Sequence, residues 1–193
     1  MTKLILASGS ANRKTILNSL HLPFEVILAN INEKSIVETN PLTRAKLLAK
    51  LKGESISRQY KAVVISADTF TSYGKKVLEK PQTINEAKTM LQFLSRKQTI
   101  NNTGFYYNDP FKKIIFSKTI ITQVKFRQFF DEEIEEYINK FPVKTWAAAY
   151  AASELYVMGM VEKVIGSLTG LTHGLPLEYL VPLLKKSGFH PHP

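Results

Sequence analysis

The sequence has no cysteine among its 193 residues, which excludes disulfide bonds, thiolate metal sites and cysteine nucleophiles. It also has no apolar run long enough to span a bilayer, and its start lacks the longer apolar segment of a secretory signal. These absences predict a cytoplasmic protein with no membrane partner. Neither a Walker loop nor a dinucleotide-binding glycine motif is present, and no Ser-His-Asp constellation can be built around His173.

Acidic residues are the minority among the charged residues. The sequence contains 26 lysines and arginines against 16 aspartates and glutamates, a formal net charge of +10. A charge of this sign favours a polyanionic partner such as nucleic acid, a nucleotide or an anionic lipid. The basic residues are scattered, however, and no zinc-finger, RNP or arginine-rich motif accompanies them. We therefore interpret most of the charge as a solvated surface and disfavour nucleic acid as the partner.

Hydrophobic residues make up 44% of the sequence, enough for one domain with a sizeable core. Strand and helix patterns alternate through the first half, and two long strand-like segments, 99–107 and 113–126, follow as a pair that could extend as an arm beyond the core. The other predicted elements are strands at 3–7, 23–28 and 62–66, helices at 12–20, 42–60 and 84–94, a helix capped by Asp131, and a last helix that ends near Lys186. This order predicts an α/β (α+β) single domain over 1–186, with a mixed twisted sheet flanked by helices, and a frayed tail over 187–193.

The first predicted strand leads into a loop that is suited to bind an anion. The apolar run Leu4–Ala7 stops at Ser8, Gly9 and Ser10, and Arg13 follows in the first turn of the predicted helix. Small residues let the loop backbone approach a ligand, and the free N–H groups at a helix start attract negative charge. The segment therefore predicts a phosphate-binding loop.

Two carboxylates follow predicted strands. Asp68 comes directly after the strand 62–66, and ligand-binding groups often lie at the carboxyl ends of strands in open α/β sheets. Asp68 can bind a divalent cation or accept a proton from water, and a capping or turn role is the alternative. Glu33 by itself is typical of a surface loop. Together with Asp68, it could complete an oxygen-ligand site for Mg²⁺, since that ion uses one or two carboxylates plus phosphates and water.

Three cations are candidates to bind phosphate groups, namely Arg13, Lys52 and Lys80, although each could also be an ordinary surface residue. Lys80 has the stronger case, because the proline after it makes a rigid turn soon after Asp68. Gly104, within a strand pattern, indicates either a plain edge-strand glycine or a close approach of two backbones.

Taken in order, these segments resemble the Maf family of nucleoside triphosphate pyrophosphatases, and the resemblance spans essentially the whole chain. No single motif is diagnostic, but their order and spacing are specific. The matching segments are Leu4–Arg13, Leu22–Glu25 with Glu33, Ser66–Thr69, Lys80-Pro81, Thr103-Gly104, Phe126–Ile138 and Gly174–Leu177.

The resemblance implies a nucleotide-binding cleft and Mg²⁺- or Mn²⁺-dependent hydrolysis of the α–β phosphate bond of a nucleoside triphosphate, which gives the monophosphate and pyrophosphate. It also implies cleansing of modified nucleotides, restraint of septum formation in bacteria, and a homodimer, as in many members. By position, Asp68 matches the catalytic base and Glu33 the metal-site glutamate, so that these two residues would hold the metal. The residues that match the phosphate-binding set are Ser8, Arg13, Lys52 and Lys80.

Two branches of the family differ in the base they prefer: one takes pyrimidine nucleotides such as dTTP and UTP, and the other takes 7-methyl-GTP. The spacing from Gly166 to Gly174 resembles the second branch, as does Glu154, whereas Thr69 resembles the first. Asn12 fits neither branch. The resemblance therefore leans towards 7-methyl-GTP, with Asn12, Thr69 and Glu154 as the specificity positions.

Three departures from the family pattern stand near the expected base and metal. Asn12 replaces an arginine or tryptophan, Asn32 replaces the aspartate before Glu33, and the segment 145–150, which includes Trp146, lacks the usual glycine in the wall around the base. These changes affect substrate choice more than phosphate chemistry. The alternative function is a weakly active or inactive relative that binds a nucleotide or nucleic acid, or that regulates cell division.

Overall fold

The computed structural model describes residues 2–192, which fold around one mixed sheet of seven strands. The strand order is β2-β1-β3-β5-β6-β7, with β4 paired to β3. β1 runs parallel to β2 and β3, and the other pairs are antiparallel. The strands are β1 (Leu4–Leu6), β2 (Glu25–Val26), β3 (Val63–Tyr73), β4 (Lys76–Leu78), β5 (Gln98–Asp109), β6 (Ile114–Phe126) and β7 (Val161–Gly166). The predicted single domain with a mixed sheet flanked by helices is confirmed.

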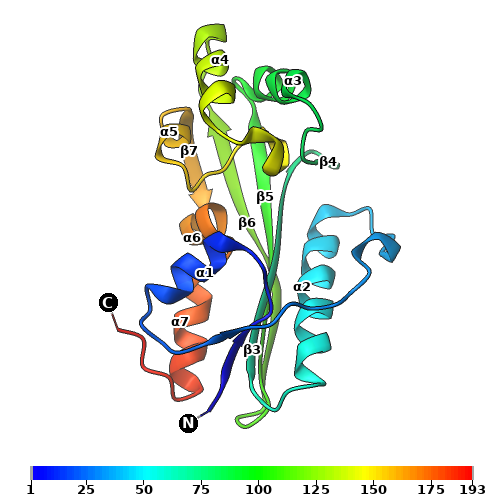
Figure 1. Ribbon diagram of the computed structural model, residues 1–193, viewed down its shortest axis with the longest axis vertical. Coiled ribbons are helices and arrows are strands. Elements are labelled where there is room, and N and C mark those ends of the chain that lie inside the picture. Colours follow the sequence, from blue (N-terminus) through cyan, green and yellow to red (C-terminus); the bar gives the residue numbers. More distant parts are fainter. Residues whose placement is uncertain (1, 193) are drawn as a thin grey trace.

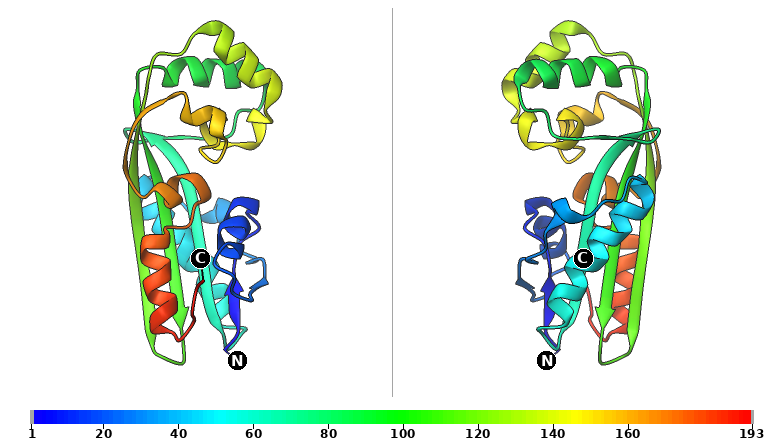
Figure 2. Two further views of the ribbon diagram at one scale, coloured as in Figure 1. Left: turned by 90° about the vertical axis from the view of Figure 1, so that its left-hand side faces the viewer. Right: turned by 90° about the vertical axis from the view of Figure 1, so that its right-hand side faces the viewer.

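Helices cover both faces of this sheet, with α2 on one side and α1 and α7 on the other (Figure 1). The end of the molecule away from both termini carries α3 and α4 (Figure 2). Within residues 2–192, no helix combines the length and the apolar composition needed to cross a membrane. The helices are α1 (Ala11–Asn18), η1 (Glu33–Ser35), α2 (Pro41–Ser57), α3 (Ile84–Leu94), α4 (Asp131–Lys140), η2 (Val143–Thr145), η3 (Ala147–Ala149), α5 (Leu155–Met158), α6 (Leu168–His173) and α7 (Leu177–Lys186).

Local sequence signals explain where most helices begin. The side chain of Ser10 accepts a hydrogen bond from the backbone N–H of Arg13 at the start of α1, and Thr83 does the same for Glu86 at the start of α3. Asn40 caps α2, whose first residue is Pro41, a position where a proline loses no helical hydrogen bond. The predicted positions of these helices are therefore confirmed to within a few residues.

The hydrophobic core is divided between the two ends of the sheet. Towards the end with the termini, β1, β3, α1 and α7 bury residues such as Leu6, Leu17 and Leu184. Towards the other end, α3 and α4 pack their apolar faces on the carboxyl end of β6, and Tyr137 of α4 and Phe126 of β6 are almost completely buried there. The middle of β3 lies between these clusters, and it is here that polar side chains gather.

β3 is longer than the predicted strand 62–66. It continues to Tyr73 because its antiparallel pairing with β5 runs unbroken from Val64 to Ser72. The expectation that Asp68 lies at the carboxyl end of its strand is therefore wrong, because Asp68 lies in the middle of β3. The strand predicted over 23–28 forms a ladder only at Glu25–Val26.

The long pair β5 and β6 forms the centre of the sheet rather than an arm beyond the core. β5 lies between β3 and β6, with α2 packed against it. Gly104 marks the close approach: a Cβ atom there would lie 1.8 Å from the carbonyl oxygen of Ala45 in α2. Of the two interpretations of this glycine, the structure supports the close backbone approach.

The segment expected to be a frayed tail makes defined contacts as far as it is described. The hydroxyl of Tyr107 donates to Ser187 Oγ over 2.7 Å, and Phe189 packs on the core beside α7. The backbone N–H of His192 donates to Leu20 O over 3.2 Å. These contacts do not test fraying, so the frayed tail over 187–193 stays a prediction. The short elements β4, β7, α5 and α6 were not predicted.

Candidate functional site

The candidate site lies at a gap in the edge of the sheet. β1 pairs with β3 as far as Ile65, and β4 pairs with β3 only from Thr71 onwards. Between them, residues 66–70 of β3 face no described strand on that side. Because successive side chains of a strand point to opposite faces, Asp68 lies on the face covered by α2 and Thr69 on the other. A ligand at this gap can therefore contact both faces of the sheet.

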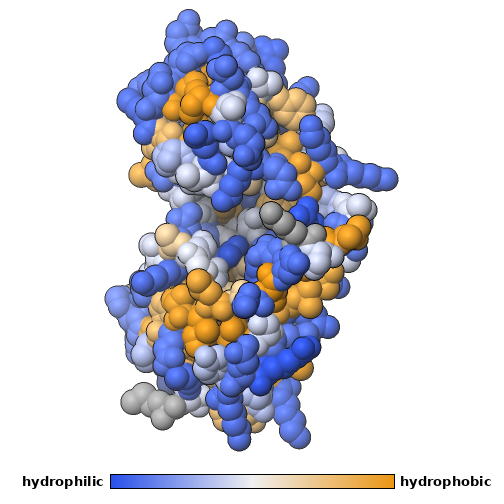
Figure 3. Space-filling view, turned by 45° about the vertical axis from the view of Figure 1, so that its right-hand side comes forward, coloured by the Kyte–Doolittle hydropathy of each residue, from blue (hydrophilic) through white to orange (hydrophobic). Residues whose placement is uncertain are grey.

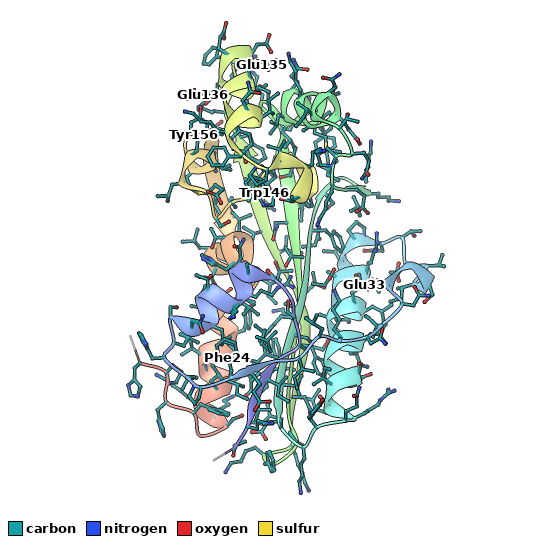
Figure 4. All side chains as sticks on the ribbon, viewed as in Figure 1. Phe24, Glu33, Glu135, Glu136, Trp146 and Tyr156 are labelled. Atoms are coloured by element: carbon teal, nitrogen blue, oxygen red, sulfur yellow. The ribbon has the colours of Figure 1, made fainter. Side chains whose placement is uncertain are left out.

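On the α2 face, one ammonium group lies between two carboxylates. Lys52 Nζ is 2.6 Å from Asp68 Oδ1 and 3.0 Å from Glu33 Oε1. The side chains of Lys52 and Asp68 are only 16% and 15% exposed, whereas Glu33, which Figure 4 labels, is 51% exposed. Three of the residues that the sequence singled out, from three separate segments, thus meet at one point.

This arrangement fits a divalent cation. The two carboxylates are close enough to share one positive charge, since the ammonium of Lys52 contacts both. Two carboxylates suffice for Mg²⁺ when substrate phosphates and water supply the other ligands. Among residues 2–192, no cluster of three or more histidine, cysteine or acidic side chains is present, so an all-protein metal cage is absent from the described structure.

On the other side of the gap, Arg13 is held by three hydrogen bonds. Its guanidinium donates to Ser8 Oγ over 2.9 Å, to Thr69 Oγ1 over 3.1 Å and to the carbonyl of Gly174 over 3.1 Å. Burial lowers the pKa of Arg13, and the nearby negative charges of Asp68 and Glu33 act in the opposite direction. Since arginine stays protonated in proteins, this is a fixed, partly desolvated cation next to the carboxylates.

Gly174 is required for this arrangement. Its φ of +67° lies in the left-handed region, and a Cβ there would lie 2.9 Å from Thr69 Oγ1 and 3.1 Å from Arg13 Nε. The turn at Gly174 thus brings a carbonyl group to Arg13.

A cavity of about 260 Å³ opens beside Arg13 on the Thr69 face of the sheet. Its lining comes from β3, β5, α1, α6 and the segment 145–152, and includes Thr71, Asn101, Trp146 and Tyr150. A second cavity on the other face is lined by Asp68, Arg44 and Glu79, and the two share Thr69, Phe70, Lys80 and Ala147. The surface is hollowed at the waist of the molecule (Figure 3).

Two of the three predicted specificity residues line a cavity, and the third does not. Asn12 lines the first cavity, and its Nδ2 donates to Ser153 Oγ over 3.1 Å, which joins α1 to the segment before α5. Thr69 lines both cavities. Glu154 lines neither of them and directly precedes α5, where its side chain makes no capping hydrogen bond. Lys80 is exposed at the junction of the two cavities.

The missing glycine in the segment 145–150 has a visible consequence. Ala148 and Ala149 both have positive φ values, 58° and 62°, a conformation that costs a residue with a Cβ roughly 1–2 kcal/mol. Both are fully buried. Trp146, labelled in Figure 4, and Tyr150 flank this strained turn and line the cavity.

Two residues of the site were missed, namely Asn101 and Arg44, whereas Tyr150 belongs to the segment 145–150 that the sequence placed around the base. Asn101 lies in a mostly polar stretch of β5, where a polar residue suggests a solvent-facing position, although it is 5% exposed. His173, to which no role was assigned, lines the first cavity, and burial lowers its pKa.

Comparison with known proteins gives a consistent result. Residues 3–187 match the family described as "Maf-like protein". The chain is 35% identical over 181 residues to a dTTP/UTP pyrophosphatase of Thermosipho melanesiensis (94% of this chain, 96% of that protein), and 32% identical over 187 residues to one of Bacillus cytotoxicus (96% of each). A HAM1 protein structure from Coxiella burnetii is similar in fold alone, with a TM-score of 0.52 and 14% identity over 96% of this chain and 100% of that one.

These relatives are pyrophosphatases of nucleoside triphosphates, which is the class of enzyme that the motifs predicted. The leaning towards 7-methyl-GTP is not confirmed, because the relatives are named for dTTP and UTP. The match extends over nearly all of the chain, from the first strand to the end of the last helix. The chain therefore belongs to the Maf family.

Proposed function

We propose that this protein hydrolyses the α–β phosphate bond of pyrimidine nucleoside triphosphates, with UTP and dTTP as the first candidates. The observation that carries the proposal is the meeting of Asp68, Lys52 and Glu33 at the sheet gap, with the half-buried Arg13 beside them. A carboxylate that can accept a proton from water, surrounded by cations that can neutralise phosphate charge, is suited to phosphoryl chemistry. The names of the relatives favour pyrimidines over 7-methyl-GTP.

In this mechanism the triphosphate lies across the gap in the sheet. Arg13, Ser8 and Lys80 bind the phosphate oxygens, since Lys80 borders both cavities described above and Ser8 lines, with Arg13, a further cavity that reaches Glu33 and Lys52. Asp68 accepts a proton from the water that attacks the α-phosphorus. The bond from that phosphorus to the bridging oxygen breaks, and the electron pair leaves with pyrophosphate, so that the nucleoside monophosphate remains.

The two carboxylates, Glu33 and Asp68, would hold Mg²⁺ or Mn²⁺. When bound, the ion supplies positive charge that stabilises the charge developing on the phosphate oxygens. Lys52 already provides one positive charge at these carboxylates. Its position indicates that it orients Asp68 before the substrate arrives.

The test is pyrophosphate release from UTP, dTTP, CTP and 7-methyl-GTP in the presence of Mg²⁺ or Mn²⁺. We expect Asp68→Asn to lower kcat at least about 100-fold, because loss of a general base typically costs 10²–10⁴ in rate. Asp131→Asn, at an exposed residue in the first turn of α4, is the matched control and retains full activity.

Equal turnover by wild type and Asp68→Asn would contradict the role of Asp68. Binding of nucleotides by the wild type without any turnover would contradict the enzyme and favour the non-catalytic binder.

A further inference from the structure

Asn101 forms part of the floor of the cavity beside Arg13. It lies on β5 directly opposite Thr71 of β3, and both side chains line this cavity. Asn101 is only 5% exposed, so its carboxamide is removed from bulk water. A buried carboxamide without partners is costly, which makes its hydrogen bonds informative.

One half of this carboxamide is held by the protein. The hydroxyl of Thr103 shares its single proton between Asn101 Oδ1 at 3.1 Å and the carbonyl oxygen of Gly170 at 3.0 Å, and Thr103 Oγ1 accepts from Thr69 Oγ1 over 3.5 Å. Thr69 in turn accepts from Arg13. A chain of hydrogen bonds thus connects the half-buried cation near the phosphate site to the floor of the cavity.

The other half of the carboxamide faces the cavity. Asn101 Nδ2 donates to no protein acceptor in residues 2–192, and it is not among the polar atoms sealed from solvent. The amide therefore presents two N–H donors to whatever enters. A carbonyl oxygen is the group that satisfies such a donor, whereas an amino group cannot.

We propose that Asn101 is a specificity-determining residue whose Nδ2 donates a hydrogen bond to the 4-carbonyl oxygen of uracil or thymine. Cytosine carries an amino group at that position, so its donor would meet the donor of Asn101 and both would stay unsatisfied. The contact involves neither the 5-methyl group nor the 2′-hydroxyl, so uridine and thymidine nucleotides can both make it. The proposal rests on the proposed function, since it places the base of the nucleotide in this cavity.

Thr103 is the positioning residue in this proposal. A carboxamide that rotates by 180° exchanges its donor for its acceptor and would then accept from the amino group of cytosine. The hydrogen bond from Thr103 holds Oδ1 away from the cavity. Discrimination between uracil and cytosine therefore depends on Thr103 as well as on Asn101.

The test measures binding without turnover. Trp146 is the only tryptophan of the chain and lines the cavity, so its fluorescence reports entry of a base. UMP, dTMP and CMP, which are products of the proposed reaction, are titrated against the wild type. We expect UMP and dTMP to bind about tenfold more tightly than CMP, the factor that corresponds to one hydrogen bond gained instead of lost.

Asn101→Val should bring the UMP-to-CMP ratio of Kd values to about one, and Asn101→Asp should invert it, because a carboxylate accepts from the amino group of cytosine. Thr103→Val should reduce the ratio while UMP still binds. Asn108→Val is the matched control on the same strand, because Asn108 lines none of the cavities described above, and it should keep the wild-type ratio. Thermal unfolding of each variant shows whether it is folded.

An unchanged ratio in folded Asn101→Val, a wild-type preference for CMP, or no binding of any of the three monophosphates would overturn the proposal. Pyrophosphate release separates this result from the proposed function. If UTP is turned over but Asn101→Val does not change the ratio, the proposed enzymatic function stands and the proposed base contact is wrong. If the monophosphates are discriminated in binding but no triphosphate is turned over, the base contact stands and the proposed enzymatic function is wrong.

Discussion

At the residue scale, Lys52 illustrates how one side chain can organise a site. Its ammonium group contacts Asp68 and Glu33 at 2.6 and 3.0 Å and is mostly shielded from solvent. Two carboxylates that lie close enough to contact the same ammonium group repel each other unless a cation lies between them. Lys52 therefore keeps the carboxylates together without a metal, and a divalent ion has to compete with it.

Replacing Lys52 by methionine tests this competition. Lys52→Met keeps the length of the side chain and removes its charge, so that the uncompensated carboxylates attract a divalent ion more strongly. We expect Mn²⁺ to bind the free protein about tenfold more tightly than it binds the wild type, as measured by isothermal titration calorimetry, since a nearby charge readily contributes more than 1 kcal/mol. Lys50→Met, at an exposed residue of the same helix, is the control. Weaker Mn²⁺ binding by Lys52→Met would contradict the proposed competition.

At the element scale, the contact of α2 with the sheet depends on the absence of one side chain. Gly104 lies under α2, where a Cβ would come within 1.8 Å of Ala45 O and 2.2 Å of Ala45 C, both backbone atoms. Backbone cannot move aside as a flexible side chain can. Since α2 carries Lys52 towards Asp68, the same contact sets the geometry of the carboxylates.

Gly104→Ala should therefore displace α2 and lower the free energy of unfolding by about 3 kcal/mol, at the upper end for overpacked cores. The measurement is urea unfolding followed by circular dichroism. Gly159→Ala is the control, because Gly159 has a helical φ of −66° and the nearest atom to a new Cβ would be 3.2 Å away. If both variants were equally stable, the close packing of α2 on β5 would be disproved.

At the scale of the whole molecule, Tyr107 joins the end of the last helix to the centre of the sheet. Its hydroxyl donates to Ser187 Oγ over 2.7 Å, with Leu183 O at 3.3 Å, and the side chain is fully buried. Burial raises the pKa of Tyr107 to about 12, and the hydrogen bond that the Ser187 hydroxyl can donate to the ionised phenolate opposes part of that rise. The neutral phenol is therefore the form that the fold accommodates.

This pKa predicts a loss of stability at alkaline pH. The unfolded chain loses the phenol proton near pH 10, whereas the folded protein keeps it up to about pH 12. The contribution of Tyr107 to the free energy of unfolding is fully present below pH 10. It falls by roughly 3 kcal/mol in all as the pH rises to 12. Urea unfolding at pH 8 to 11 should show a shallower decline for Tyr107→Phe than for the wild type. The control is Tyr60→Phe at an exposed position, and a wild-type slope in Tyr107→Phe would contradict the assignment.

Much of the fold could be predicted because its signals are local. The apolar runs of β1 and β3, and the caps at Ser10 and Thr83, act within a few residues of where they stand. The site was predicted only as a set of residue types. The distances among Asp68, Lys52 and Glu33 could not be predicted, because they depend on how α2 crosses β3. Asn101 was missed because the burial of one strand residue depends on which elements cover it.

The sequence by itself determined the mixed α/β fold, the Maf family and the residues that gather at the candidate site, since apolar periodicity, capping residues and ordered motifs are properties of short segments. Only the tertiary structure decided how the residues of the candidate site come together. β1 ends at Leu6 while β3 continues to Tyr73, and this difference in length opens the gap where Asp68 meets Lys52 and Glu33. The register between distant strands sets that gap, and no local pattern encodes it.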